Sequence, residues 1–141
     1  MVVYDGSGAN LSAARAWWMF RIFGHGDVAV LDGGLGAWRR EGRALEHGEP
    51  AAVPPGDFTG LRQLGLVRDV DAVRDALRTE GELLVDVRSP ARFSAEAPEP
   101  RAGIRGGHIP GSRNLHYADL VDAEGRLLGD EVMRAVVARG G

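Results

Sequence analysis

Two arginines in the second half of the chain, Arg92 and Arg101, have the chemistry to bind a small anion. A guanidinium group is planar and always charged, and its forked N–H groups donate paired hydrogen bonds to the oxygens of a carboxylate or of thiosulfate. Arg92 follows a predicted strand, and ligands of open α/β sheets bind beyond the carboxyl ends of the strands. The pattern alone favours two solvated surface arginines over an anion site.

A second group of polar residues frames this segment. Asp86 and Arg88 lie at the end of the same predicted strand, and His108 begins the turn Gly-His-Ile-Pro-Gly. A histidine can act as a base or as a metal ligand, but a structural hydrogen bond to Asp86 or to a backbone group is the simpler role here. We therefore expect Asp86, Arg88 and His108 to brace the loop. His116 and Asp119 alone are too few for a metal site, which needs three or four ligands.

Composition excludes several classes of function. The 141 residues include no cysteine, which rules out disulfides, cysteine–zinc sites and a thiol nucleophile. The formal charge is −3, whereas nucleic-acid binders usually carry a basic face. No apolar run reaches the roughly 18 residues of a membrane helix, and no signal-peptide pattern is present. We expect a cytoplasmic protein with neither nucleic acid nor membrane as a partner, and with no cofactor and no metal.

The elements that must position these residues alternate between strands and helices. Val2–Tyr4 is β-branched and aromatic and predicts a strand, which the turn residues Asp5–Gly8 end. A helix is predicted over about 12–23, with Ser12 as a plausible N-cap. Its expected buried face consists of apolar residues at three- and four-residue spacing, namely Ala14, Trp17, Trp18 and Ile22. These tryptophans could instead mark a binding surface, but core or interdomain packing is the expected role.

Two further elements and a linker follow. Val28–Leu31 is an apolar run typical of a strand buried in a parallel sheet, and a short helix should follow near 35–41. Residues 43–65 are rich in proline and glycine and show no periodicity, which is typical of a linker.

The second part repeats the α/β alternation. Asp69 should cap a helix that runs to about Gly81, and Leu83–Val87 predicts another buried strand. Ser89 and Pro90 have the cap and first-turn chemistry of a short helix. A short strand near 113–115 and a last helix capped by Asp130 complete the prediction.

Alternating strands and helices predict the α/β class, with a mostly parallel sheet flanked by helices. A buried strand that starts at residue 2 and a chain that stops at a helix end suggest a piece of a longer protein. We expect two partial domains, 1–42 and 66–141, joined by the linker 43–65. The turn Gly6-Ser7-Gly8 could begin a dinucleotide-binding motif, but Leu11 stands where the third glycine belongs.

Several short motifs stand in a fixed order along the chain: Val2–Gly6, Ala14–Met19, Phe23–His25, Val30–Gly34 with Trp38, Leu83–Arg88, Ser89–Phe93 and Gly106–Leu115. Together they resemble the tandem-domain rhodanese-type sulfurtransferases of the thiosulfate and 3-mercaptopyruvate types. In this resemblance, 1–42 is the second half of the first rhodanese-like domain and 66–141 is the first half of the second. One small departure is His116, where many relatives have proline.

The resemblance implies sulfur transfer through a cysteine persulfide, from 3-mercaptopyruvate or thiosulfate to cyanide or a thiol acceptor. The cysteine of the second domain would lie beyond Gly141, and Asp5 takes the cysteine-equivalent place of the silent first domain. An aspartate cannot attack a sulfane sulfur and repels an anionic donor. Turn statistics favour the simpler role of Asp5 as the cap of a turn or of a helix start, and in both interpretations Asp5 is not a nucleophile. Arg92 and Arg101 resemble the two arginines that hold the donor's carboxylate and keto oxygen.

The resemblance therefore implies a sulfurtransferase fragment that has no catalytic residue and is inactive alone. The alternative is a non-catalytic rhodanese-like module that binds an anion or a protein partner. We also hypothesise that the two half-domains close into a single sheet, because their strand contents are complementary and the linker is long enough. Otherwise the halves should expose apolar faces and sheet edges, and the chain should have poor stability or aggregate.

Overall fold

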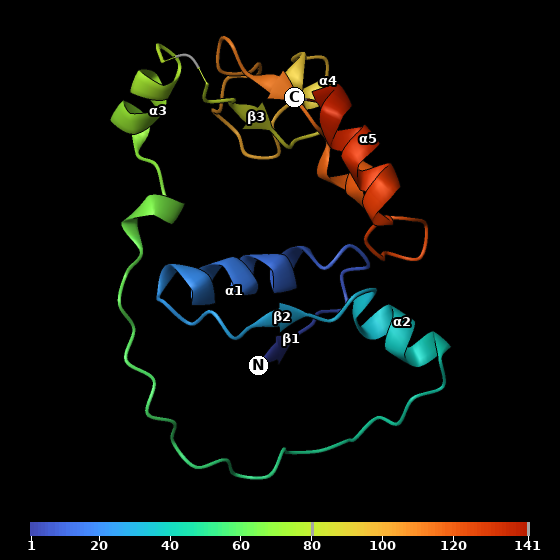
Figure 1. The fold of residues 1–141 in the computed structure, drawn as a ribbon. Helices are drawn as coiled ribbons and strands as arrows, with labels where there is room; N and C mark the ends of the chain where they lie inside the picture. The colour runs from blue at the N-terminus through green and yellow to red at the C-terminus, as the bar shows by residue number, and fades with distance from the viewer. Residues whose placement is uncertain (80, 141) are drawn as a thin grey trace. The chain divides into compact units, whose positions relative to one another are not determined.

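The computed structural model describes residues 1–79 and 81–140, which form two compact units (Figure 1). Unit 1 contains Met1–Val67 and Ala123–Arg126, and unit 2 contains Arg68–Asp122 and Leu127–Gly141. Glu80 and Gly141 lie outside the described residues, so the predicted helix through Glu80 can be judged only on either side of it. The assignment of these units to halves of two domains stays a prediction.

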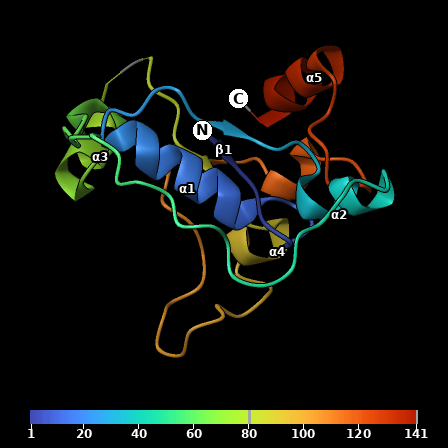
Figure 2. The same cartoon turned by 90° about the horizontal axis from the view of Figure 1, so that it is seen from below.

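Unit 1 is built on a small parallel sheet. Strand β1 (Val2–Val3) pairs with β2 (Ala29–Val30), with Val2 opposite Ala29 and Val3 opposite Val30. Helix α1 (Leu11–Ile22) connects the two strands and lies against them (Figure 2). The predicted parallel sheet is therefore confirmed for this unit. Parallel strands need such a crossover connection, because a tight turn cannot join them.

The buried side of α1 differs from the predicted face. Ala13 and Ile22 are buried and Trp17 is half-buried, whereas Ala14 and Trp18 are exposed. The indole Nε1–H of Trp17 donates to the Val28 carbonyl at 3.0 Å, which fixes the side of the helix that faces β2. The prediction was wrong for Ala14 and Trp18 because apolar residues run almost all round this helix, and its spacing fits more than one face.

Helix α1 begins one residue earlier than predicted. Asn10 is the residue before its first turn and has a left-handed backbone, with a φ of 52°, so Ser12 is inside the helix and not its N-cap. Helix α2 (Gly34–Arg40) follows β2, close to the predicted range 35–41. Gly34 has a φ of 53°, and a Cβ atom there would overlap the Asn10 side chain and lie 2.8 Å from the Asp5 carbonyl oxygen. The contact of α2 with the turn after β1 therefore requires glycine.

The linker has no helix or strand from 43 to 63, and its residues are exposed (Figure 1). Its far end is bonded to α1: the Leu61 N–H donates to the Phe23 carbonyl at 2.9 Å, and the Gln63 N–H donates to the Ile22 carbonyl at 2.6 Å. A short 3-10 turn at Leu64–Leu66 then leads into unit 2.

Unit 2 contains a second small parallel sheet. Strand β3 (Val85–Asp86) pairs with β4 (Arg113–Asn114), as predicted for this part of the chain. The helices are α3 (Val70–Ala76), α4 (Pro90–Phe93) and α5 (Asp130–Gly140), with a 3-10 turn at Tyr117–Leu120.

Local predictions in unit 2 have mixed outcomes. Asp69 caps α3 as expected, because its carboxylate accepts the Ala72 N–H at 2.9 Å. The helix ends at Ala76 and not near Gly81. Strand β3 is shorter than the predicted Leu83–Val87, and both Leu83 and Val87 are about half exposed, at 51% and 52%. They are exposed because the two-stranded sheet covers little of their surface.

The two sheets are separate, and no strand ladder joins them within residues 1–79 and 81–140. The hypothesis that the halves close into a single sheet is therefore wrong. The α/β class is confirmed, since helices and small parallel sheets make up both units. None of the helices in the described chain is long and apolar enough to cross a membrane.

Candidate functional site

The candidate site lies at the carboxyl end of β3. Asp86 is the last residue of this strand, and α4 begins at Pro90, which has the fixed φ that suits a first helical position. From the neighbouring strand β4, the Asn114 Nδ2 donates to the carbonyl oxygens of Asp86 and Arg88, at 2.9 Å each. The Asn114 amide thus fixes the backbone that leads from β3 towards Arg92 on α4.

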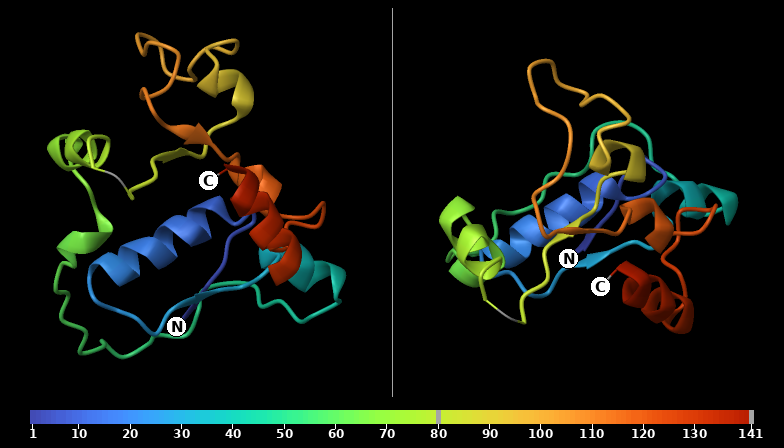
Figure 3. Two further views of the ribbon diagram at one scale, coloured as in Figure 1. Left: turned by 45° about the horizontal axis from the view of Figure 1, so that its top comes forward. Right: turned by 90° about the horizontal axis from the view of Figure 1, so that it is seen from above.

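Arg88 is the brace of this region. Its Nε donates to both carboxylate oxygens of Asp86 at 3.0 Å, and its Nη2 donates to Asp86 Oδ2 at 2.5 Å. The same Nη2 donates to the Gly107 carbonyl at 2.7 Å, and Nη1 donates to Glu99 Oε1 at 2.6 Å. The guanidinium thus connects the strand end to two points of the loop between α4 and β4, residues 94–112. Figure 3 shows the path of this loop.

Arg92 is held by the same carboxylate. Its Nη2 donates to Glu99 Oε2 at 2.5 Å, and the Glu99 side chain is only 6% exposed. The Nε of Arg92 is buried and has no hydrogen-bond partner among the described residues. Arg92 is 31% exposed, so part of its guanidinium remains accessible to a ligand.

The two carboxylates at the site are held in the charged form. Hydrogen bonds from Arg88 lower the pKa of Asp86 and outweigh its burial, which alone would raise it. The hydrogen bond from Arg92 lowers the pKa of Glu99 in the same way, with further help from the charge of Arg88. At neutral pH the two arginines and the two acids therefore sum to zero charge.

His108 contacts the end of α4. Its Nδ1 lies 2.8 Å from the Phe93 carbonyl oxygen, and its ring stacks on the Phe93 ring with centroids 3.7 Å apart. A pocket of about 410 Å³ lies beside it and is lined by Asp86, Arg88, Arg105 and the turn 106–109. The histidine thus holds the turn against α4, while its own ring is exposed.

Arg101 lies apart from this network. It is exposed in the 94–112 loop, and its guanidinium makes no hydrogen bond or ion pair with any residue that the structure describes. The structure therefore brings together Asp86, Arg88 and Arg92. The hydrogen bond from Arg88 to the Gly107 carbonyl joins the turn of His108 to them. Arg101 keeps an uncompensated positive charge on the same loop.

Sequence patterns did not reveal Glu99, which accepts hydrogen bonds from both arginines. It stands between Pro98 and Pro100 in a segment that reads as an irregular loop. The only available signal was a charged residue between two prolines, which restrict the backbone around it.

Asp5 belongs to unit 1 and makes its contacts there. Its Oδ1 accepts the N–H and the hydroxyl of Ser7 at 2.7 and 2.6 Å, and its Oδ2 accepts the Ala13 N–H at 2.8 Å. Burial works to raise the pKa of Asp5, but the hydrogen bonds from Ser7, Ala13 and Ser12 together lower it. The carboxylate thus lies at the N-terminus of α1, where the helix dipole favours a negative charge.

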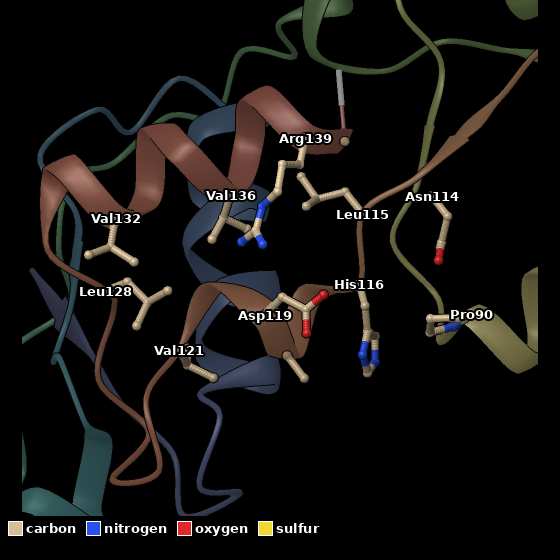
Figure 4. Close-up of a pocket in the computed structure, with 12 residues that line it drawn as sticks. Pro90, Asn114, Leu115, His116, Asp119, Val121, Leu128, Val132, Val136 and Arg139 are labelled. Atoms are coloured by element: carbon tan, nitrogen blue, oxygen red, sulfur yellow. The ribbon is translucent and has the colours of Figure 1, made fainter.

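A larger pocket of about 700 Å³ in unit 2 is lined mainly by aliphatic side chains (Figure 4). Val132 and Val136 of α5 face Val121 and Leu128, with His116, Asp119 and Arg139 also in the lining. No group of three or more His, Asp or Glu residues that could hold a metal occurs within 1–79 and 81–140.

Three comparisons place the chain among known proteins. Residues 69–137 match the model of the rhodanese-like domain. A relative from Arabidopsis thaliana, thiosulfate/3-mercaptopyruvate sulfurtransferase 1, mitochondrial, is 40% identical over 95% of this chain and 40% of its own length. The 3-mercaptopyruvate sulfurtransferase of Escherichia coli strain K12 is 40% identical over 96% of this chain and 47% of its own length.

The structural comparison agrees. A crystal structure of SseA from Escherichia coli, described as showing the rhodanese fold of 3-mercaptopyruvate sulfotransferases, superposes with a TM-score of 0.83 and 37% identity. The match covers 99% of this chain and 51% of that chain. The chain thus spans less than half the length of the two curated relatives.

Proposed function

The chain belongs to the rhodanese-like family, and from this premise we propose that it is the donor-binding part of a thiosulfate/3-mercaptopyruvate-type sulfurtransferase. Its α/β fold is rhodanese-like, as the resemblance implied. In the proposed function, Arg92 and Arg101 bind the oxygens of an anionic sulfur donor, either 3-mercaptopyruvate or thiosulfate. The acceptor is a thiol or cyanide.

In the proposed reaction a cysteine thiolate attacks the outer sulfur of thiosulfate, or the thiol sulfur of 3-mercaptopyruvate, and becomes a persulfide. The S–S bond of thiosulfate breaks and sulfite leaves, or the C–S bond of 3-mercaptopyruvate breaks and the enolate of pyruvate leaves and takes up a proton. The persulfide then passes its outer sulfur to the acceptor. None of the 141 residues is a cysteine. Asp5, in the proposed cysteine-equivalent place, is an anion whose oxygens already accept hydrogen bonds from unit 1. We therefore propose that this chain binds the donor and does not turn it over.

The observation that carries the proposal is the state of Arg92. The Arg92 guanidinium is hydrogen-bonded to the nearly buried carboxylate of Glu99. Its direction is therefore fixed before a ligand binds. Arg101, exposed in the 94–112 loop, adds a positive charge to the set of two arginines and two acids around Arg92, which is neutral as a whole.

Anion binding tests this function directly. Pyruvate, which lacks the sulfur of 3-mercaptopyruvate, and thiosulfate are titrated into the full chain by calorimetry. Arg92→Lys and Arg101→Gln should each weaken binding about tenfold, the usual worth of a charge-assisted hydrogen bond. Arg78→Gln is the matched control, because Arg78 is an exposed arginine just after α3 and its ion pair is with Asp75 of that helix. Unchanged affinity in both site variants would refute the proposal.

Activity is measured on the same sample. With thiosulfate and cyanide, the full chain should form no thiocyanate above the blank, because no residue can carry the persulfide. Turnover above the blank would overturn the proposed inactivity.

The second candidate is a non-catalytic rhodanese-like module that binds an anion or a protein partner, and the absence of cysteine favours it. Sulfate discriminates between the two, because it has oxygens but no sulfane sulfur and no planar carboxylate. Binding of sulfate as tight as that of pyruvate, with no effect of Arg92→Lys, supports the general module.

The cytoplasmic location also stays a prediction. One relative is named as mitochondrial, so fractionation of cells that express the tagged full chain is the direct measurement.

A further inference from the structure

We propose that Glu99 is a positioning residue, which holds the Arg92 guanidinium in the orientation that receives the anionic donor. This inference rests on the proposed function and deepens it, because it assigns a role to a residue that no sequence motif indicated. Glu99 itself does not touch the donor; it acts through Arg92.

The Glu99 carboxylate is shared between two arginines. One of its oxygens, Oε1, accepts from Arg88 Nη1 at 2.6 Å, and the other, Oε2, accepts from Arg92 Nη2 at 2.5 Å. A carboxylate that accepts one hydrogen bond on each oxygen cannot rotate without losing both. The direction of Arg92 therefore depends on the direction of Arg88.

Arg88 is itself held in place. Its remaining donors bind Asp86 and the Gly107 carbonyl, and Asp86 is the last residue of β3. A continuous set of hydrogen bonds thus runs from the sheet through Arg88 and Glu99 to Arg92. The backbone of Glu99 is restricted as well, since proline fixes its own φ and limits the residue before it.

Arg92 keeps hydrogen-bond donors that its ion pair with Glu99 does not use. Only its Nη2 binds a described residue, so Nη1 remains for a ligand. Arg92 and Glu99 carry opposite charges, so this ion pair has no net charge with which to attract an anion. Arg92 thus acts as an oriented donor of hydrogen bonds more than as a free charge.

Charge and geometry make opposite predictions for Glu99. If the carboxylate mattered only as a negative charge near the donor, its removal would tighten anion binding. If it positions Arg92, its removal frees the guanidinium and weakens binding. Glu99→Gln separates the two, because glutamine has nearly the same shape without the charge.

The test uses phenylglyoxal, which modifies arginine, on the full chain, with peptide mass spectrometry to measure the rate at each arginine. Arg92 should react about tenfold faster in Glu99→Gln, because a charge-assisted hydrogen bond no longer holds it. Pyruvate should protect Arg92 in the unchanged chain, and the pyruvate concentration for half protection should rise about tenfold in Glu99→Gln. Glu99→Asp, which keeps the charge on a shorter side chain, should recover part of both effects.

Two controls separate positioning from general loosening of the fold. Glu96→Gln removes an exposed carboxylate of the same loop and should change neither rate nor protection. Arg74 on α3 and Arg78 just after it should react at the same rate in every variant, since a partly unfolded unit 2 would break their ion pairs with Asp71 and Asp75.

Each outcome either supports or contradicts the positioning role of Glu99. An unchanged Arg92 rate in Glu99→Gln, or tighter protection by pyruvate, would overturn the positioning role. Protection that is present but unaffected by Glu99→Gln would overturn this inference alone. Absence of protection at every arginine of the unchanged chain would instead refute donor binding, and the positioning role with it.

Discussion

At the scale of single residues, Asp5 shows how one carboxylate can fix both a turn and a helix. It accepts hydrogen bonds from Ser7 on one oxygen and from Ala13 on the other, so it links the end of β1 to the first turn of α1. The carboxylate thus satisfies N–H groups that a helix start leaves without partners.

We predict that Asp5→Ala destabilises unit 1 by about 1 kcal/mol, the usual cost of losing a capping side chain. The effect should depend on pH. Because the folded-state pKa of Asp5 is lowered, its stabilisation is complete above the ordinary value of 3.8 and is lost as the pH falls through the folded-state pKa.

Urea unfolding followed by tryptophan fluorescence measures this effect, since Trp17, Trp18 and Trp38 all lie in unit 1. Asp5→Asn should flatten the acid side of the stability profile, whereas Asp57→Asn in the exposed linker should leave it unchanged. Equal pH profiles for the Asp5 variant and the unchanged chain would show that the carboxylate does not cap α1.

Arg88 gives a second prediction at this scale. Arg88→Lys keeps the charge, but a single ammonium group cannot span Asp86, Glu99 and the Gly107 carbonyl at once. Amide hydrogen exchange in the 94–112 loop should therefore become faster. Arg105→Lys, an exposed arginine of the same loop, is the control, and equal exchange in the two variants would contradict the bracing role.

At the scale of elements, the two glycines of α2 should respond in opposite directions to the same substitution. Gly34→Ala should destabilise unit 1 by about 2 kcal/mol, because of its positive φ and the overlap of a Cβ with the turn after β1. Gly36→Ala should stabilise it by about 0.5 kcal/mol, since alanine favours a helix interior and the nearest atom, Arg40 Nη1 at 3.3 Å, is the end of a flexible side chain. Thermal unfolding of the two variants measures both, and a shift of the same sign in both would contradict the assignment.

The elements also show which features a sequence pattern can predict. The Asp69 cap was predictable because donor and acceptor are three residues apart. The start of α1 was not, because its first turn is bonded to Asp5, and no spacing rule connects a helix to a carboxylate on the far side of a glycine turn. The positions of the strands were indicated by apolar runs, but their lengths depend on neighbouring strands, which no local pattern contains.

Some residues of the candidate site could be predicted from the sequence and one could not. Asp86 ends β3, and Arg88 and Arg92 follow it closely in the sequence. The strand and helix patterns therefore predicted where these residues lie. Glu99 joins them across an irregular loop, where periodicity carries no information. Its role therefore had to come from the structure.

At the scale of the whole molecule, the buried core is small relative to the apolar surface. Few hydrophobic residues are buried, among them Ile22, Val28 and Val136, while Val2 and Leu127 are each 63% exposed. Each described sheet has only two strands, so both of its strands have an open edge.

We predict that the purified chain binds an apolar dye such as anilinonaphthalene sulfonate and associates as its concentration rises. Fluorescence titration and sedimentation velocity measure these two properties. A monomer that binds no dye and unfolds in one cooperative thermal transition would contradict the expectation of poor stability.

The two prolines beside Glu99 restrict its backbone, and this restriction affects the rates of ligand binding and release. Because the chain orders Glu99 and Arg92 when it folds, a ligand meets groups that need no rearrangement before they can bind it. Association should then be similar for anions of similar size, limited by diffusion and by the loss of bound water. Differences in affinity between donors should appear in their residence times on the protein.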